Sequence, residues 1–514
     1  FPPYIEPWDP NIDPLLTSAV NMLGSYMAAE LTAEGKKGVV IQGIYDAYTP
    51  ARAYQHYHAG ARILSETASA NLASPVTVDP ERLRGGRGYD AGQRSWNYPA
   101  PWTGGAWGLP DITAYMEAGA LALLTNAAHN RRFWVDNFAA INRRAVEGWR
   151  DDWPAAWVIP AGQDNQTGVD NVVWILRMGD VEVHRAAEPF SAGGRRFPAG
   201  SLVIPDGQPY FGFAHTLLDR QEYPDLRQYP GGPPQPPYDV TAHTLPLLMD
   251  VEAVALEDAP GVALSEPVPL PDVRYRAPGW LRGPDAPRIA LYKSWQEPMT
   301  EGWTRWVLDQ HGVAYDTLHD ADIRGGALAR YDVLLLEDQG AGSIREGWAA
   351  GRMPEEFTGG LGAEGTAAVE RFVRAGGRLV AIGAATEFAA QALGLPLENA
   401  VEGLPSSEFY VPGSILGLDL APGALGGAPA PPGVWFWRSS RAFEARPGLE
   451  VLARYAADPL RSGWALGQER IAGQPALVRA EVGEGDAVLF GFPPNYRGQT
   501  VGTWPLLFAA LGGR

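Results

Sequence analysis

The residues with the clearest potential for chemistry are a glutamate and a tyrosine. Glu66 follows the apolar pair Ile63-Leu64 and precedes a run of small residues, while Tyr45 lies 21 residues upstream in the loop of residues 42–50. A carboxylate can act as a general base by holding a water molecule near an electrophile, and a phenol can donate a hydrogen bond to a bound substrate. Together, the two residue types suggest a hydrolytic site.

The spacing alone leaves simpler interpretations open. An ordinary glutamate at the end of a strand and a tyrosine packed in a loop would give the same pattern. Tyr48 occupies the same loop as Tyr45.

Apolar runs and helical patterns are expected to position these residues. Residues 37–41 (Lys-Gly-Val-Val-Ile) predict a short buried strand, and a second strand should end near Glu66. Helical periodicity covers residues 13–34, and two further helices are predicted at 109–130 and 131–150. The glutamate and the tyrosine should therefore meet where two strands end.

Composition excludes several classes of function. The chain has 514 residues with 46% hydrophobic and 19% charged, which is typical of a globular protein with ample core. The net charge of −18 disfavours nucleic acid as a partner, because an acidic surface repels phosphates. The absence of cysteine excludes disulfides, thiolate zinc sites and cysteine nucleophiles. No apolar run approaches the roughly 20 residues of a transmembrane helix.

The rest of the chain predicts a multidomain α/β protein. Asp151-Asp152-Trp153-Pro154 ends the helical pattern, and a strand–helix–strand order follows it, as in a βαβ layer. A proline-rich segment, expected to be stiff and extended, then precedes a second α/β unit. The predicted parts are residues 1–150, a small α/β domain at 151–225, a connector at 226–287 and an α/β domain at 288–514.

Residues 1–150 resemble the C-terminal part of the catalytic domain of M14 zinc carboxypeptidases, especially large bacterial members with additional C-terminal domains. The resemblance rests on Pro2-Pro3-Tyr4, on Pro10-Asn11-Ile12-Asp13-Pro14 and on Ile63-Leu64-Ser65-Glu66-Thr67-Ala68-Ser69. It implies part of an α/β/α sheet, a peptide substrate, a zinc cofactor and a secreted or periplasmic location. It also implies that Glu66 is the general base and that Tyr45, or alternatively Tyr48, closes on the substrate.

The zinc ligands of that family have no counterpart in this sequence. The family uses a His-x-x-Glu pair and a later histidine, but His184 has its glutamate one residue too far, and His319 lies outside the peptidase-like part. His56 and His58 could share one face of a strand and hold a metal, although no third ligand is evident. Phe1 would follow the family's last zinc histidine, so we expect a truncated chain.

Residues 288–514 resemble a class I glutamine-amidotransferase-like domain. Active members carry a cysteine at a sharp turn between a strand and a helix, and the matching turn here is Gly383-Ala384-Ala385-Thr386-Glu387. Without a cysteine, no amidotransferase reaction is expected. Thr386 is better interpreted as a helix N-cap, a common role of threonine.

The sequence therefore predicts the C-terminal portion of a zinc metallocarboxypeptidase, in which Glu66 serves a zinc-bound water and peptides lose their C-terminal residue. One alternative is a catalytically inactive module that binds peptide or glycan. Another is complementation, in which a second chain supplies the zinc ligands.

Overall fold

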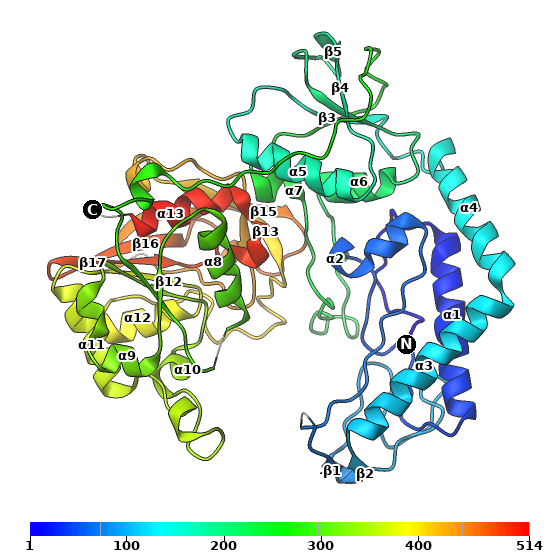
Figure 1. The fold of residues 1–514 in the computed structure, drawn as a ribbon, viewed down its shortest axis with the longest axis horizontal. Coiled ribbons are helices and arrows are strands. Elements are labelled where there is room, and N and C mark those ends of the chain that lie inside the picture. The colour runs from blue at the N-terminus through cyan, green and yellow to red at the C-terminus, as the bar shows by residue number, and fades with distance from the viewer. Residues whose placement is uncertain (72, 297, 445, 513–514) are drawn as a thin grey trace.

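A computed structural model describes residues 1–71, 73–296, 298–444 and 446–512 of the chain. It confirms the predicted class, because the protein is multidomain and mixes helices with several sheets. Figure 1 shows an N-terminal unit of helices and loops, a small sheet with its helices, and a large C-terminal sheet flanked by helices. Within the described residues, no helix combines the length and apolar character needed to cross a membrane.

The N-terminal unit is built on long helices. The first begins after Asp13, whose carboxylate accepts a hydrogen bond from the Leu15 amide and so caps the helix. Its buried face, which includes Leu16, Val20 and Leu23, follows helical spacing as predicted. The elements of this unit are α1 (Pro14–Ala33), α2 (Pro50–Ala53), the 3₁₀ helix η1 (Tyr54–His58), β1 (Val76–Val78), β2 (Gly105–Trp107), α3 (Leu109–His129) and α4 (Arg131–Glu147).

The two strands predicted beside Glu66 and Tyr45 do not form. Residues 37–41 and the residues around Glu66 lie in irregular backbone, and the strands of this unit are the antiparallel pair β1 and β2. The apolar side chains of Val39, Ile41 and Ile63 instead pack against α1 and α3. Both strand predictions are wrong. The apolar pattern indicates only that these residues are buried, whereas a strand also needs an adjacent strand to pair with its backbone hydrogen-bonding groups.

The small unit carries a four-stranded sheet in the order β4-β7-β3-β8. All its pairs are antiparallel, so the predicted parallel βαβ arrangement is wrong. The predicted connector supplies β8, which pairs with β3. The elements are β3 (Ala156–Ile159), α5 (Gln166–Met178), β4 (His184–Arg185), β5 (Phe190–Ala192), β6 (Arg195–Phe197), β7 (Leu202–Pro205), α6 (Phe211–Leu218), α7 (Leu245–Met249) and β8 (Val254–Leu256).

The C-terminal unit contains a nine-stranded sheet in the order β10-β9-β11-β12-β17-β16-β15-β13-β14. The first five strands pair in parallel, and the others are antiparallel. The central parallel strands are buried because helices cover both faces, and their residues are apolar apart from Arg378 at the start of the fourth strand in this order.

The elements of the C-terminal unit are β9 (Ile289–Tyr292), α8 (Met299–Gln310), β10 (Asp316–Leu318), α9 (Asp320–Arg324), β11 (Val333–Leu336), α10 (Ala341–Glu346), α11 (Gly362–Arg374), β12 (Arg378–Ile382), α12 (Ala385–Leu393), β13 (Ser414–Leu420), β14 (Val434–Phe436), β15 (Glu450–Ser462), β16 (Pro475–Val482), β17 (Gly485–Phe490) and α13 (Trp504–Leu511).

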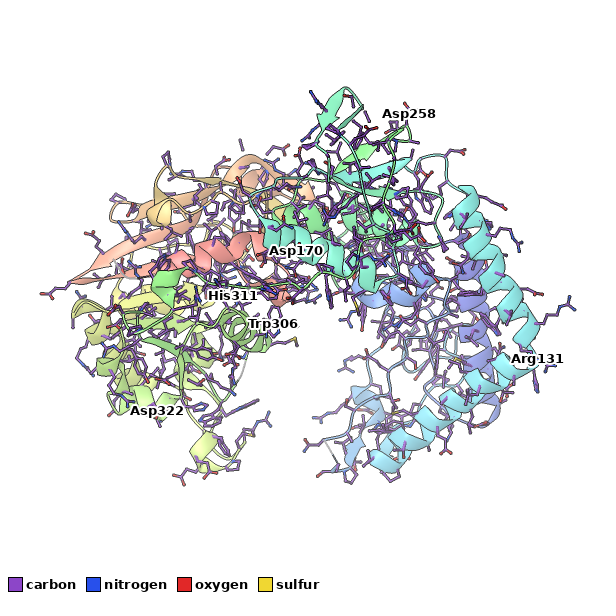
Figure 2. All side chains as sticks on the ribbon, turned by 45° about the horizontal axis from the view of Figure 1, so that its top comes forward. Arg131, Asp170, Asp258, Trp306, His311 and Asp322 are labelled. Carbon is purple, nitrogen blue, oxygen red and sulfur yellow. The ribbon has the colours of Figure 1, made fainter. Side chains whose placement is uncertain are left out.

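Aromatic contacts join the small unit to the C-terminal unit. The Tyr275 hydroxyl donates to Asn171 Oδ1 on α5 at 2.6 Å, and the Tyr275 ring lies 5.8 Å from Trp306 and 5.3 Å from His311. Figure 2 shows Trp306 and His311 on the side of the C-terminal unit that faces α5, where Asp170 is labelled. The predicted connector therefore packs between the two units.

Candidate functional site

Glu66 lies on a segment held by a buried tyrosine. The Tyr4 hydroxyl accepts a hydrogen bond from the Leu64 amide at 2.6 Å and donates to the Arg62 carbonyl at 3.1 Å. His56 Nε2 lies 3.2 Å from the same carbonyl. These contacts satisfy backbone groups that a strand would have paired, and they leave the Glu66 side chain exposed.

Two tyrosines meet at the Glu66 carboxylate. The Tyr238 hydroxyl donates to Glu66 Oε1 at 3.1 Å, and the Tyr45 and Tyr238 rings meet edge to face with centroids 4.7 Å apart. Burial raises the pKa of Tyr45, and the negative charge of Glu66 raises it further. The pKa of Tyr238 is raised by the same two causes. Both phenols therefore stay protonated at neutral pH and can act as hydrogen-bond donors.

Tyr48, the alternative to Tyr45, lies in a different environment. Its ring packs edge to face against Tyr223 at 4.8 Å and lies 6.0 Å from His243. Burial raises its pKa, with a further increase from the charge of Asp9. Of the two predicted tyrosines, the structure brings Tyr45 to Glu66, whereas Tyr48 packs against these other side chains.

Two arginines add positive charge beside the tyrosines. The Arg52 guanidinium lies over the Tyr238 ring, 5.1 Å from its centroid, and its Nε is 3.7 Å from Asp239 Oδ2. The positive charges of Arg52 and Arg62 both act to lower the pKa of Tyr238, although burial and Glu66 prevail. The site thus combines an exposed carboxylate, two phenols and two cations, which can bind a polar ligand through hydrogen bonds and ion pairs.

The groups around Glu66 do not fit a zinc site. Zinc in proteins is bound by imidazole, thiolate and carboxylate. Here the neighbours of the carboxylate are phenols and guanidinium groups. The described residues contain no group of three histidine, cysteine, aspartate or glutamate side chains placed to hold a metal ion. The zinc expected from the resemblance would have to be held by residues other than these.

The two histidines considered as a metal pair have other partners. His56 and His58 lie on η1, not on a strand as the prediction required. His56 stacks on Trp8 at 5.7 Å, and burial lowers its pKa to about 4. His58 places one ring nitrogen 2.9 Å from the Tyr54 carbonyl and the other 2.9 Å from the Gly179 carbonyl. His56 therefore packs within the N-terminal unit, whereas His58 links that unit to the end of α5 in the small unit.

Tyr238 is the residue that the sequence did not reveal. It lies 172 residues from Glu66, in the proline-rich segment predicted as a connector. Its backbone amide donates to Asp46 Oδ2 at 2.9 Å, which fixes the segment against the Tyr45 loop. No sequence motif connects a tyrosine in a proline-rich segment with Glu66. The contact is therefore visible only in the tertiary structure.

Two adjacent acidic residues, Glu337 and Asp338, lie in the C-terminal unit directly after β11. Glu337 is fully buried, the Thr304 hydroxyl donates to its carboxyl group, and burial raises its pKa to about 8. Asp338 Oδ1 accepts a hydrogen bond from the Ala384 amide at 2.9 Å. This contact holds the sharp turn from β12 into α12 that the amidotransferase-like resemblance predicted.

The residues of that turn offer no nucleophile of the expected kind. Gly383 has a φ of +55°, and a Cβ at this position would lie 2.5 Å from Asp338 Oδ1. Thr386 is buried, and its hydroxyl donates to the Gly383 carbonyl at 2.6 Å. Because α12 begins at Ala385, Thr386 lies inside its first turn and is not the N-cap.

Comparisons with known proteins give remote similarities. No family model and no curated protein matches the chain. Among solved structures, a cytoplasmic protein of Salmonella typhimurium is 13% identical and has a TM-score of 0.30, with 44% of this chain and 100% of that protein covered. A cold-adapted β-galactosidase of Rahnella sp. is 16% identical with a TM-score of 0.26, covering 43% of this chain and 30% of the enzyme. An exo-β-1,4-mannosidase of an Opitutaceae bacterium is 13% identical with a TM-score of 0.27, covering 45% and 37%.

Proposed function

We propose that this chain supplies the carboxylate and tyrosine part of a peptide-hydrolysing site of the carboxypeptidase type. The supporting observation is that Glu66 and Tyr45, 21 residues apart in irregular backbone, meet at one place with the carboxylate exposed. Glu66 would be the general base and Tyr45 the phenol that contacts the substrate. The metal of such a site would come from residues other than those around Glu66.

The proposed roles follow from the charge state of each group. An exposed carboxylate can accept a proton from the water that attacks a peptide carbonyl, and can then pass this proton to the leaving amine. Tyr45 keeps its proton at neutral pH because burial and Glu66 raise its pKa. It can therefore donate a hydrogen bond to the peptide, while Arg52 and Arg62 provide positive charge near a C-terminal carboxylate.

The test is release of the C-terminal residue from a short peptide with a free carboxylate. The assay uses the protein isolated from its source with any further segments or chains that accompany it, supplemented with Zn²⁺. Glu66→Gln should lower kcat by about 100-fold or more, the usual contribution of a general base. Glu117→Gln, which changes an exposed carboxylate on α3, should leave kcat unchanged. Wild-type turnover by Glu66→Gln would refute the proposal.

A second candidate is a binding module without catalysis. It is favoured by the hydrogen bond that Tyr238 already donates to Glu66, because this contact occupies one oxygen of the proposed base. The same peptide would then bind to the 514-residue chain in calorimetry, and binding would weaken in Glu66→Gln, without release of an amino acid in the hydrolysis assay. Peptide release that depends on Glu66 would exclude this candidate.

A further inference from the structure

Residues 237–241 form a segment, here called the strap, that lies between the N-terminal and C-terminal units. Figure 1 shows the loop that contains it, between α6 and α7, extending from these helices of the small unit past α2. On one side, the Tyr238 hydroxyl donates to Glu66 Oε1 at 3.1 Å. On the other side, the Thr241 amide donates to the Gly413 carbonyl at 2.9 Å, just before β13. One short segment therefore contacts both units.

Asp239 joins the two units through arginines. Its side chain is 4% exposed, and its two oxygens accept hydrogen bonds from Arg497 at 2.6 and 3.0 Å. Arg52 of α2, in the N-terminal unit, places its Nε 3.7 Å from Asp239 Oδ2. A buried carboxylate needs such partners, and a bidentate arginine contact also fixes its orientation.

The backbone of Arg497 is itself unusual. Its φ is +49°, in the left-handed region that non-glycine residues rarely adopt. Strained backbone of this kind persists where the surroundings hold it, and it is concentrated at functional positions. Here the guanidinium is held by Asp239 and lies 5.0 Å from the centre of the Tyr496 ring. The left-handed backbone at Arg497 thus places its guanidinium in contact with Asp239 of the strap.

We propose that Tyr238 is a positioning residue for the Glu66 carboxylate, and that the C-terminal unit sets its place through the ion pair of Asp239 with Arg497. The hydrogen bond from Tyr238 fixes one carboxylate oxygen and leaves the other for a ligand or a water molecule. The C-terminal unit, whose own turn lacks a cysteine, thereby becomes part of the Glu66 site. The catalytic meaning of this contact rests on the proposed function, whereas the contact itself can be tested without any activity.

The test measures how readily Tyr238 is acetylated by N-acetylimidazole, with peptides quantified by mass spectrometry. Tyr229 lies in the loop that precedes the strap and is 62% exposed, so it provides an internal reference. Arg497→Asn removes the guanidinium with a residue that tolerates the left-handed backbone. The ratio of Tyr238 to Tyr229 acetylation should rise at least about fivefold, because the substitution leaves the buried Asp239 carboxylate without its bidentate partner.

Arg470→Gln is the matched control, because it breaks the exposed ion pair of Arg470 with Glu408 in the same unit. Its ratio should stay at the wild-type value. Arg497→Lys keeps the charge without the bidentate contact, so its ratio should be intermediate, and it also serves if Arg497→Asn does not fold. An unchanged ratio in the folded Arg497 variants would overturn the proposal. A raised ratio in a chain that lacks hydrolysis would instead reject only the proposed function.

Discussion

Two glutamates, one in the N-terminal unit and one in the C-terminal unit, occupy opposite environments. Glu66 is exposed and accepts a hydrogen bond from a phenol. Glu337 is enclosed at the end of β11, and its pKa is raised to about 8 by burial and by the negative charges of Asp338 and Glu301. The same chemical group can therefore serve a ligand at one site, whereas at the other it is a protonated part of the core.

The largest expected difference between the two environments is in the free energy of unfolding lost when each glutamate is replaced by alanine. Glu337→Ala leaves a cavity and removes the acceptor of the Thr304 hydroxyl, so it should lower the free energy of unfolding by about 2–4 kcal/mol. Glu66→Ala should cost less than about 1 kcal/mol, because the side chain is exposed. Urea unfolding followed by tryptophan fluorescence measures both. Equal losses would contradict the difference in burial.

Stability should also depend on pH through Glu337. Its pKa is about 8 in the folded protein and 4.5 ordinarily, so between these values the unfolded chain releases a proton that the folded protein keeps. The stabilising contribution is complete below pH 4.5 and is lost as the pH rises to about 8. Glu337→Gln should remove on the order of 3–4 kcal/mol of this dependence between pH 5 and pH 8.

Comparing the pH dependence of unfolding in the wild type and in Glu337→Gln isolates the contribution of Glu337. Asp9 and Asp46, whose pKa values burial raises to about 6, contribute equally to the wild type and to Glu337→Gln. Urea unfolding at pH 5 and at pH 8 measures the difference. Parallel pH dependence in the two proteins would show that Glu337 does not keep its proton in the folded state.

A glycine substitution at each site probes how tightly the surrounding backbone is fixed. Gly383→Ala should cost about 1–2 kcal/mol, because φ is +55° and the new Cβ would lie 2.5 Å from Asp338. Gly43→Ala beside Tyr45 should cost less than about 1 kcal/mol, since its Cβ would meet Val40 at 3.5 Å, an ordinary contact. Urea unfolding again gives both values. A larger loss at Gly43 would reverse the expected order.

The sequence predicted the meeting of Glu66 and Tyr45 but not the way in which the backbone achieves it. The expected strands are absent because their apolar side chains pack on α1 and α3 without a neighbouring strand. Helices were predicted more accurately: residues 13–34 correspond to α1. Helical bonds are local, whereas a strand depends on a partner that periodicity cannot identify.

The features that the sequence did not predict are contacts between residues far apart in the chain. Tyr238 contacts Glu66 across 172 residues, and Asp239 contacts Arg497 across 258. The antiparallel sheet of the small unit likewise depends on β8, which comes from a segment whose proline content suggested only a connector. None of these pairings has a local signature in composition or spacing.

Titration of Tyr45 tests most directly whether it shares a site with Glu66. With 3-fluorotyrosine at position 45, ¹⁹F NMR follows the ionisation of this phenol, whose neighbours are Glu66, Tyr238 and Tyr4. Glu66→Gln removes a negative charge that disfavours the phenolate, so the pKa of the label should fall, while Glu117→Gln should leave it unchanged. An identical titration in the wild type and in Glu66→Gln would contradict a shared site.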